Sequence, residues 1–299
     1  MRILSSALLL SAGTLLAGCA VDPSRDLDQI PIATPRQPAL QDEVAAVRIG
    51  QFVESSERSE QELALLFYQR GLYFSRLGLD WLAHVDFRRA VELGPDFAEA
   101  YNQLGVQFTL LDQFDDAYEA FDSAIELEPA NDFALLNRGI ALHYAGRHQL
   151  ALRDLEIYYR RQTDDPYRAI WLYLVQYPLA PEQAQQRLAS IAPVLRPGWG
   201  KTLVHYLLGR MTDGELLELS QIQGELQEGE PQSLEERLCE AYFYMGQQAL
   251  KRRQIERAAN YFRLSAATNI YEFVEHNFAL YELRRLDLDS EWSAEDGPQ

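Results

Sequence analysis

The small and apolar positions of this chain recur at a fixed spacing along its sequence. The residues that repeat at an offset of 34 are Gly71 and Gly105, Ala83 and Ala117, Phe87 and Phe121, Ala90 and Ala124, and Pro95 and Pro129. A third copy follows in the same phase at Gly139, Leu142, Ala151 and Leu155. Each copy predicts two antiparallel helices, with the small residues where the two helices approach closely. The prolines end the second helix, because proline lacks the amide donor and clashes with the preceding turn.

A period of 34 residues is that of the tetratricopeptide repeat. The sequence therefore predicts an all-α tetratricopeptide-repeat helical solenoid, with three repeats over residues 61–166. The phase is lost in an irregular helical segment at 167–235, where Pro178, Pro181, Pro193 and Pro197 interrupt it and short helices are expected at 167–175, 182–191, 201–208 and 213–227. It returns at Gly246, Ala258 and Phe262, so residues 236–286 are expected to form a fourth repeat plus a C-terminal capping helix.

The N-terminal residues predict export and lipidation. Residues 1–18 read as a cleaved signal peptide, because Arg2 is followed by an apolar run at 3–16 that is too short to span a membrane comfortably. The sequence LAGC at 16–19 resembles the lipobox of bacterial lipoproteins, which implies acyl chains on Cys19. Several acyl chains anchor a protein stably where one does not. The residue after Cys19 is Ala20 rather than an aspartate, which in enteric-type bacteria implies sorting to the outer membrane. The alternative is an ordinary cleaved signal with a chance cysteine.

The segments that flank the repeats predict three different structures. Residues 19–40 are expected to be a flexible linker, because prolines stand among polar residues without a helical period. Residues 41–60 predict a helix with an apolar stripe that includes Val44 and Val47. This helix either caps the first repeat or contacts a second subunit. Residues 287–299 are expected to be an acidic disordered tail.

The formal net charge of −18 excludes one class of partner. The only lysines are Lys201 and Lys251. Such a surface repels phosphate backbones, so no nucleic acid is expected, and charge alone does not attract it to anionic lipid. After lipidation of Cys19 the only remaining thiol is Cys239, so no internal disulfide can form. We expect Cys239 to be a small buried residue without a catalytic role.

The residue patterns of known catalytic and metal sites are missing from this sequence. The stretch GWGKT at 198–202 resembles a phosphate loop, but the glycine required five residues before the Gly–Lys pair is Leu195. His143 and His148 are five residues apart, which puts them on different faces of one helix. Neither HExxH nor GxSxG occurs. The sequence therefore predicts no enzyme, no cofactor, no metal site and no small-molecule ligand.

The first helices of the repeats carry the candidate binding residues, because they line the concave face of such a solenoid. Asn and Gln can pair with the backbone of an extended peptide while rings take its side chains. The predicted protein-binding residues are Tyr68, Gln69, Leu72, Glu99, Asn102, Gln103, Val106, Phe133, Asn137, Ile140, His143 and Tyr144, with Leu65 and Leu136 in the same register. Ordinary packing between repeats is the competing explanation for each. Asn137 resembles the asparagine of carboxylate-clamp repeats, but Tyr68, Leu72 and Tyr144 stand near where such a clamp has lysines.

The whole pattern resembles the NlpI-type bacterial outer-membrane lipoproteins. The segments that carry the resemblance are FDDAYEAFDS at 114–123, LNRGIAL at 136–142 and NIYEFVEHNFALYEL at 269–283. The resemblance implies a homodimeric, non-catalytic adaptor, anchored in the outer membrane by lipid and facing the periplasm. It further implies that the adaptor binds peptidoglycan hydrolases, including a murein endopeptidase, and presents them to a tail-specific periplasmic protease, thereby regulating cell-wall turnover and division. The alternative is a pilotin-like or outer-membrane-assembly lipoprotein with a structural role.

Overall fold

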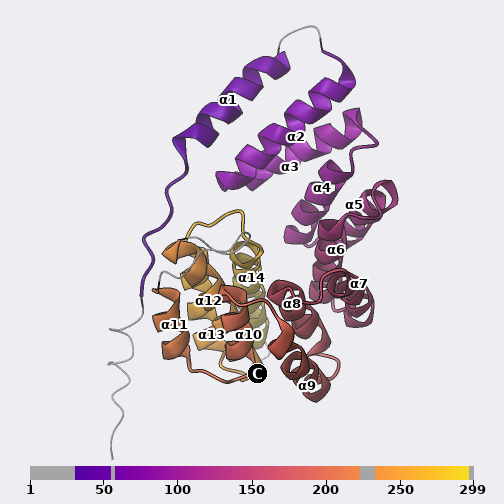
Figure 1. Cartoon of the computed structure of the whole chain (residues 1–299). Coiled ribbons are helices and arrows are strands. Elements are labelled where there is room, and N and C mark those ends of the chain that lie inside the picture. Colours follow the sequence, from indigo (N-terminus) through magenta and orange to yellow (C-terminus); the bar gives the residue numbers. More distant parts are fainter. Residues whose placement is uncertain (1–30, 55–57, 223–232, 296–299) are drawn as a thin grey trace, which may run out of the picture. The chain divides into compact units, whose positions relative to one another are not determined.

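The computed structural model describes residues 31–54, 58–222 and 233–295, with side chains described up to residue 287 (Figure 1). Every regular element in these ranges is a helix, which confirms the all-α prediction. The helices are α1 (Leu40–Glu54), α2 (Glu60–Arg76), α3 (Asp80–Leu93), α4 (Ala98–Leu110), α5 (Phe114–Leu127), α6 (Asp132–Tyr144), α7 (His148–Arg161), α8 (Pro166–Gln176), α9 (Pro181–Ile191), α10 (Trp199–Leu207), α11 (Asp213–Ser220), α12 (Leu234–Lys251), α13 (Ile255–Ala266) and α14 (Val274–Glu295), with a short 3-10 helix, η2 (Ala192–Val194).

The repeated glycines lie where the two helices of a repeat touch. A Cβ atom on Gly105 of α4 would lie 2.7 Å from the ring of Phe121 on α5. The same contact recurs in the fourth repeat, where a Cβ atom on Gly246 of α12 would lie 2.4 Å from the ring of Phe262 on α13. Gly71 faces Phe87 and Gly139 faces Leu155 in the same way. The 34-residue period therefore has a steric cause, because only glycine leaves room for the ring or leucine that closes each repeat.

A second feature recurs in repeats one and three. Arg70 of α2 makes a bidentate pair with Asp86 of α3, with N–O distances of 2.7 and 2.8 Å. Arg138 of α6 pairs with Asp154 of α7 at the same two distances. Both aspartates are buried, and repeat two has the apolar Leu104 at the position of the arginines. Removing one partner would strand a buried charge, so these pairs fix how the two helices of a repeat meet.

From α8 to residue 222 the structure is a run of short helices that lacks the 34-residue pattern. Two of them start on a proline at their first turn, where its missing N–H costs no hydrogen bond, namely α8 at Pro166 and α9 at Pro181. Gly198 precedes α10 with a φ of 137°, and Lys201 donates to the backbone carbonyl of Leu195 at 2.9 Å. The GWGKT stretch is thus a turn that opens a helix.

The C-terminal part of the expected linker differs from the flexible segment predicted for residues 19–40. Ala33 is buried, and the backbone N–H of Arg36 donates to the carbonyl of Thr268 at 2.9 Å. The Arg36 guanidinium also bonds the carboxylate of Glu236 at the start of α12, at 2.5 Å. These contacts tie Arg36 to the fourth repeat. Sequence patterns could not show this, because Glu236 is 200 residues away from Arg36 and Thr268 is farther still.

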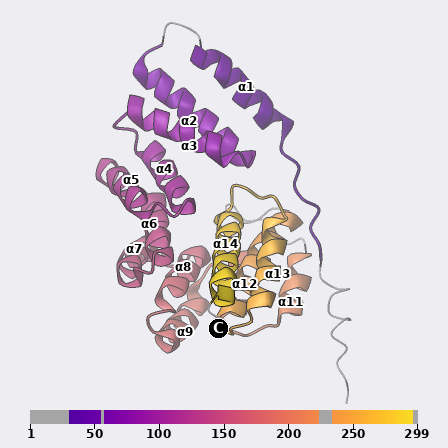
Figure 2. The same ribbon diagram turned by 180° about the vertical axis from the view of Figure 1, so that it is seen from behind.

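The C-terminal helix also differs from its prediction. It packs against α12 and α13, as Figures 1 and 2 show, and it reaches the end of α4 as well. The Tyr281 hydroxyl bonds the Asp112 carboxylate, and Arg284 donates to the backbone carbonyl of Leu110. The helix continues to Glu295, whereas residues 287–299 were expected to be a disordered tail. A helix predicted as an end cap is therefore a brace between the fourth repeat and the second.

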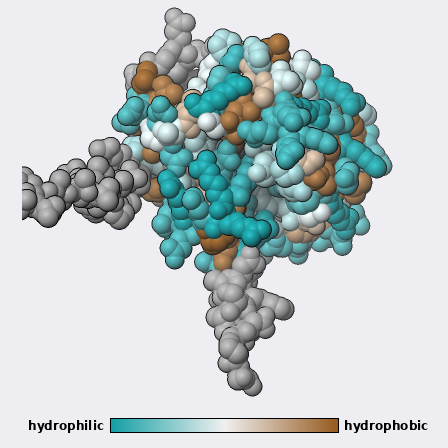
Figure 3. Space-filling view, turned by 90° about the horizontal axis from the view of Figure 1, so that it is seen from below, coloured by the Kyte–Doolittle hydropathy of each residue, from teal (hydrophilic) through white to brown (hydrophobic). Residues whose placement is uncertain are grey.

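The described surface is consistent with a highly charged chain. The face in Figure 3 is mostly hydrophilic, with hydrophobic residues scattered over it. None of the helices that the structure describes is long and apolar enough to cross a membrane. The predicted signal peptide at 1–18 and the lipidation residue Cys19 lie outside the described residues, so both stay predictions.

Candidate functional site

The twelve predicted binding residues divide into three groups by exposure. Gln69, Glu99 and Phe133 are exposed, and the ring of Phe133 is 68% accessible. The half-buried residues are Tyr68, Leu72, Gln103, Val106, Asn137 and His143. The buried ones are Asn102, Ile140 and Tyr144. Only the first two groups offer atoms to a partner without a rearrangement.

The exposed residues fall on one line across the repeats. Leu65, Glu99 and Phe133 occupy the same repeat position, and Gln69 and Gln103 occupy the position one turn later. All five are exposed or half-buried, and they lie on α2, α4 and α6. We call this set the first-helix stripe. It combines an aliphatic side chain, an aromatic ring, a carboxylate and two amides, which suits an extended peptide.

Two of the predicted amides are already partnered. The Asn137 side chain on α6 donates to the side-chain carbonyl of Asn102 on α4 at 3.0 Å. Asn102 is buried, so this bond joins repeats two and three inside the structure. Asn102 therefore contributes to packing here, as the competing explanation required. Asn137 is half-buried and keeps hydrogen-bonding capacity beyond this one donor.

The third repeat is covered where Tyr144 lies. The ring of Phe278 on α14 stacks on Tyr144, with centroids 4.5 Å apart and planes 7° from parallel. Tyr281 of the same helix lies edge-on to Tyr144 at 4.8 Å. Tyr144 is left 8% exposed, so α14 occupies the part of the predicted surface that this ring would have offered. The open surface thus runs over repeats one and two and ends at Phe133.

His143 and His148 come together, which corrects their placement on different faces of one helix. His143 lies in the last turn of α6 and His148 begins α7, and the turn between these helices brings the ring centroids to 5.0 Å. Burial, with the nearby cations, lowers the pKa of His143 to about 3, so this ring is neutral. Among the described residues, no group of three or more His, Cys, Asp or Glu side chains could hold a metal ion.

Cys239 lies in the packed interior of the fourth repeat. It is 0% exposed, and its Sγ lies 3.6 Å from the hydroxyl of Ser265. Burial raises the pKa of this thiol to about 12, so the thiolate that a nucleophile needs does not form near neutral pH. Its surroundings match those of a structural cysteine.

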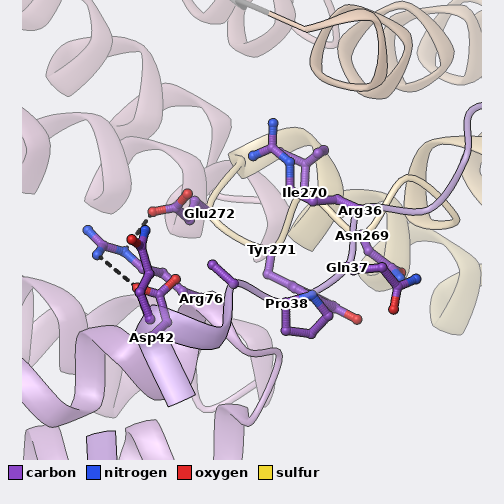
Figure 4. Close-up of a pocket in the computed structure, with 11 residues that line it drawn as sticks. Arg36, Gln37, Pro38, Asp42, Arg76, Asn269, Ile270, Tyr271 and Glu272 are labelled. Carbon is purple, nitrogen blue, oxygen red and sulfur yellow. Dashed lines mark hydrogen bonds and ion pairs between the residues drawn. The ribbon is translucent and has the colours of Figure 1, made fainter. Parts of the chain in front are cut away.

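A cavity of about 250 Å³ lies between residues 36–42 and the α13–α14 connection (Figure 4). Arg76 lies at its edge, bonded to Glu272 at 2.8 Å and 3.9 Å from Asp42. One guanidinium at this edge is therefore shared by two carboxylates. The cavity joins the N-terminal segment to the fourth repeat, and Arg76 is already paired at this edge.

Two residues with an unusual environment were missed by the sequence analysis. Lys251 ends α12 and Arg285 lies on α14, and both line a second cavity described below. The only sequence signal was that Lys251 is one of two lysines and ends a largely apolar helix. Its position against α8 and α14 depends on long-range packing, which no local pattern encodes.

Comparison with known proteins addresses the fold. No family model matches the chain. A solved tetratricopeptide repeat protein from Parabacteroides merdae is 14% identical, with a TM-score of 0.50 over 83% of this chain and 78% of that one. The chain has the tetratricopeptide-repeat fold.

Two further solved structures are more distant in shape. YrrB, described as a tetratricopeptide repeat protein with an unusual peptide-binding site, is 14% identical and has a TM-score of 0.42 over 81% of this chain and all 100% of that one. PilF from Pseudomonas aeruginosa is 22% identical and has a TM-score of 0.43 over 75% of this chain and 99% of that one. At these values the two likenesses add nothing to the assignment of fold.

Proposed function

We propose that this protein is a non-catalytic adaptor of the NlpI type, held at the outer membrane by lipid on Cys19 and facing the periplasm. In this role it binds peptidoglycan hydrolases, including a murein endopeptidase, and presents them to a tail-specific protease. The consequence for the cell is control of cell-wall turnover and division. The residue likenesses at 114–123, 136–142 and 269–283 suggest these partners.

One observation supports an adaptor most strongly, and it is the first-helix stripe. Three consecutive repeats expose Leu65, Glu99 and Phe133 at the same position, while the residues behind them pack in the core. A single exposed ring is ordinary on a protein surface. A line of exposed groups at the repeat spacing suits a client segment that extends across the repeats. We assign the client segment to this stripe.

Tethering supplies the mechanism. A lipid on Cys19 confines the adaptor to one leaflet, and two bound proteins then meet at an effective concentration that raises avidity by roughly 10²–10⁴. We place the dimer contact at α1, where Leu40, Val47 and Phe52 are 71%, 65% and 51% exposed. A dimer would double the number of stripes that each anchor point carries.

Capture from detergent-solubilised envelope tests this assignment. We expect Phe133→Ala to lower the recovery of murein hydrolases about tenfold, because loss of an aromatic anchor typically costs about 1–2 kcal/mol. Trp81→Ala is the matched control, since Trp81 is 70% exposed but lies on α3, a second helix. Its recovery of hydrolases should equal that of the wild type.

Other results would count against the proposal in different ways. If Phe133→Ala and Trp81→Ala recovered equal amounts of hydrolase, the client would not bind at the first-helix stripe. Recovery of secretin or barrel-assembly components in place of a protease and hydrolases would contradict the adaptor and favour a structural lipoprotein.

A further inference from the structure

A cavity of about 400 Å³ lies where the ends of α6, α8 and α12 meet α14. We call it the basic pocket. Its polar lining includes His143, His148, Lys251, Glu282 and Arg285. Aliphatic side chains of α8, α12, α13 and α14 and the rings of Tyr144 and Tyr177 form most of the remaining wall. This volume is at the lower end of the range for small-ligand sites, with room for about one or two amino-acid residues.

The ammonium group of Lys251 has no hydrogen-bond partner among the described residues. Its Nζ atom has almost no contact with solvent, although the side chain as a whole is only half-buried. The nearest groups are aromatic, because Nζ lies 4.1 Å from the ring centroid of Tyr173 and 4.3 Å from that of Tyr177. Ring faces offset part of the cost of burying a cation, but they do not replace a hydrogen-bond acceptor.

The one carboxylate that lines the basic pocket is already bonded elsewhere. Glu282 accepts a hydrogen bond from the Gln247 side chain at 2.9 Å and pairs with Arg285 at 3.4 Å. His143 and His148 have lowered pKa values, and the charges that lower that of His143 further are all cationic. The pocket is therefore locally positive within a chain of net charge −18.

We propose that the basic pocket binds one carboxylate of a peptide, with the Lys251 ammonium turning away from the rings of Tyr173 and Tyr177 to become its direct partner and the aliphatic wall holding an adjacent apolar side chain. A carboxylate would supply the acceptors that Nζ lacks, and its single charge matches the single unpaired cation. A phosphate fits less well, because its second charge would face Glu282 with no further unpaired cation in the pocket. The site is separate from the first-helix stripe and requires neither the anchor nor any particular client.

The proposal predicts how binding depends on pH. Burial without an acid partner lowers the pKa of Lys251 to about 7, and a bound carboxylate would raise it again. Binding therefore takes up a proton above pH 7, and affinity should fall by up to about tenfold per pH unit there. The titratable groups near Lys251 are Tyr173 and Tyr177, whose rings it contacts, and His143, His148, Glu282 and Arg285 in the pocket lining. The two histidines are already neutral in this range.

Carbon-13 labelling of the lysine ε-carbons measures this directly in the full chain in detergent. Only two signals arise, and that of Lys201, which bonds backbone carbonyls of the α9–α10 connection, is an internal reference. We expect acetyl-Ala-Leu-Leu with a free carboxylate to raise the titration midpoint of Lys251 by about one pH unit or more. The same peptide with a C-terminal amide should leave the titration of both lysine signals unchanged.

A third probe, acetyl-Ala-Glu-Leu amide, identifies the source of the carboxylate. A shift of Lys251 with this probe supports the proposal with an acidic side chain as the ligand. Three results would overturn the proposal. The titration midpoint of Lys251 would shift with neither carboxylate peptide, or shift equally with the neutral amide, or shift with inorganic phosphate alone.

The variant Lys251→Met separates binding from folding. We expect it to lose the binding of the free-acid peptide and to keep or raise the melting temperature, because it removes an unpaired buried charge and keeps the aliphatic stem. A lower melting temperature together with unchanged peptide binding would make Lys251 a structural residue and contradict the proposal.

Discussion

Phe121→Ala should lower the free energy of unfolding by about 3–5 kcal/mol. The ring is fully buried on α5, lies against Gly105 of α4 and packs with Ala141 of the next repeat. Its removal would leave a cavity at the junction of repeats two and three, which the backbone cannot collapse to fill. Urea denaturation followed by circular dichroism measures the loss.

Two comparisons make this prediction specific. Phe133→Ala also removes a phenylalanine ring, but from an exposed site, so we expect the free energy of unfolding to change by no more than about 0.5 kcal/mol. Gly105→Ala should destabilise the wild type by contact with the Phe121 ring, yet stabilise the Phe121→Ala variant by about 1 kcal/mol through helix propensity. Simple additivity of the Gly105 and Phe121 changes would contradict the steric origin of the 34-residue period.

Phe278→Ala should detach α14 from the third repeat. The ring is 5% exposed, stacks on Tyr144 and lies 6.4 Å from Trp171. Loss of this buried ring should cost about 3–5 kcal/mol, which corresponds to roughly a 10²–10⁴-fold loss of hydrogen-exchange protection in α14. The backbone amides near Tyr144 at the end of α6 should lose protection in parallel.

Leu280→Ala is the control for this effect, because Leu280 lies on the same helix and is 41% exposed. It should leave exchange in α14 close to that of the wild type. If Phe278→Ala also left α14 protected, the stack on Tyr144 would not be what holds the helix in place.

Local sequence patterns predicted most of the helical framework. The Gly–Phe pairs, such as Gly105 with Phe121, fix the two-helix unit because their contact forms inside one repeat. The helices expected at 167–175 and 182–191 are found as α8 and α9, each of which starts on a proline one residue earlier. These signals involve residues close together in the sequence, so they can be recognised without the tertiary structure.

Contacts between distant segments could not be predicted in this way. The docking of Arg36 on Glu236 and of Tyr281 on Asp112 joins residues 200 and 169 positions apart. The same limit explains why Asn102 and Tyr144 were predicted as binding residues. Their repeat positions lie on first helices, but Asn137 and Phe278, which contact them, come from other helices of the chain.

Site-specific crosslinking in the envelope tests whether the first-helix stripe binds a protein partner. A photoreactive p-benzoylphenylalanine at position 133 should capture a murein hydrolase, whereas the same group at position 81 should not. Both positions hold exposed aromatic residues, so they differ chiefly in the helix that carries them. Capture of the same hydrolase at position 81 and not at position 133 would contradict the account.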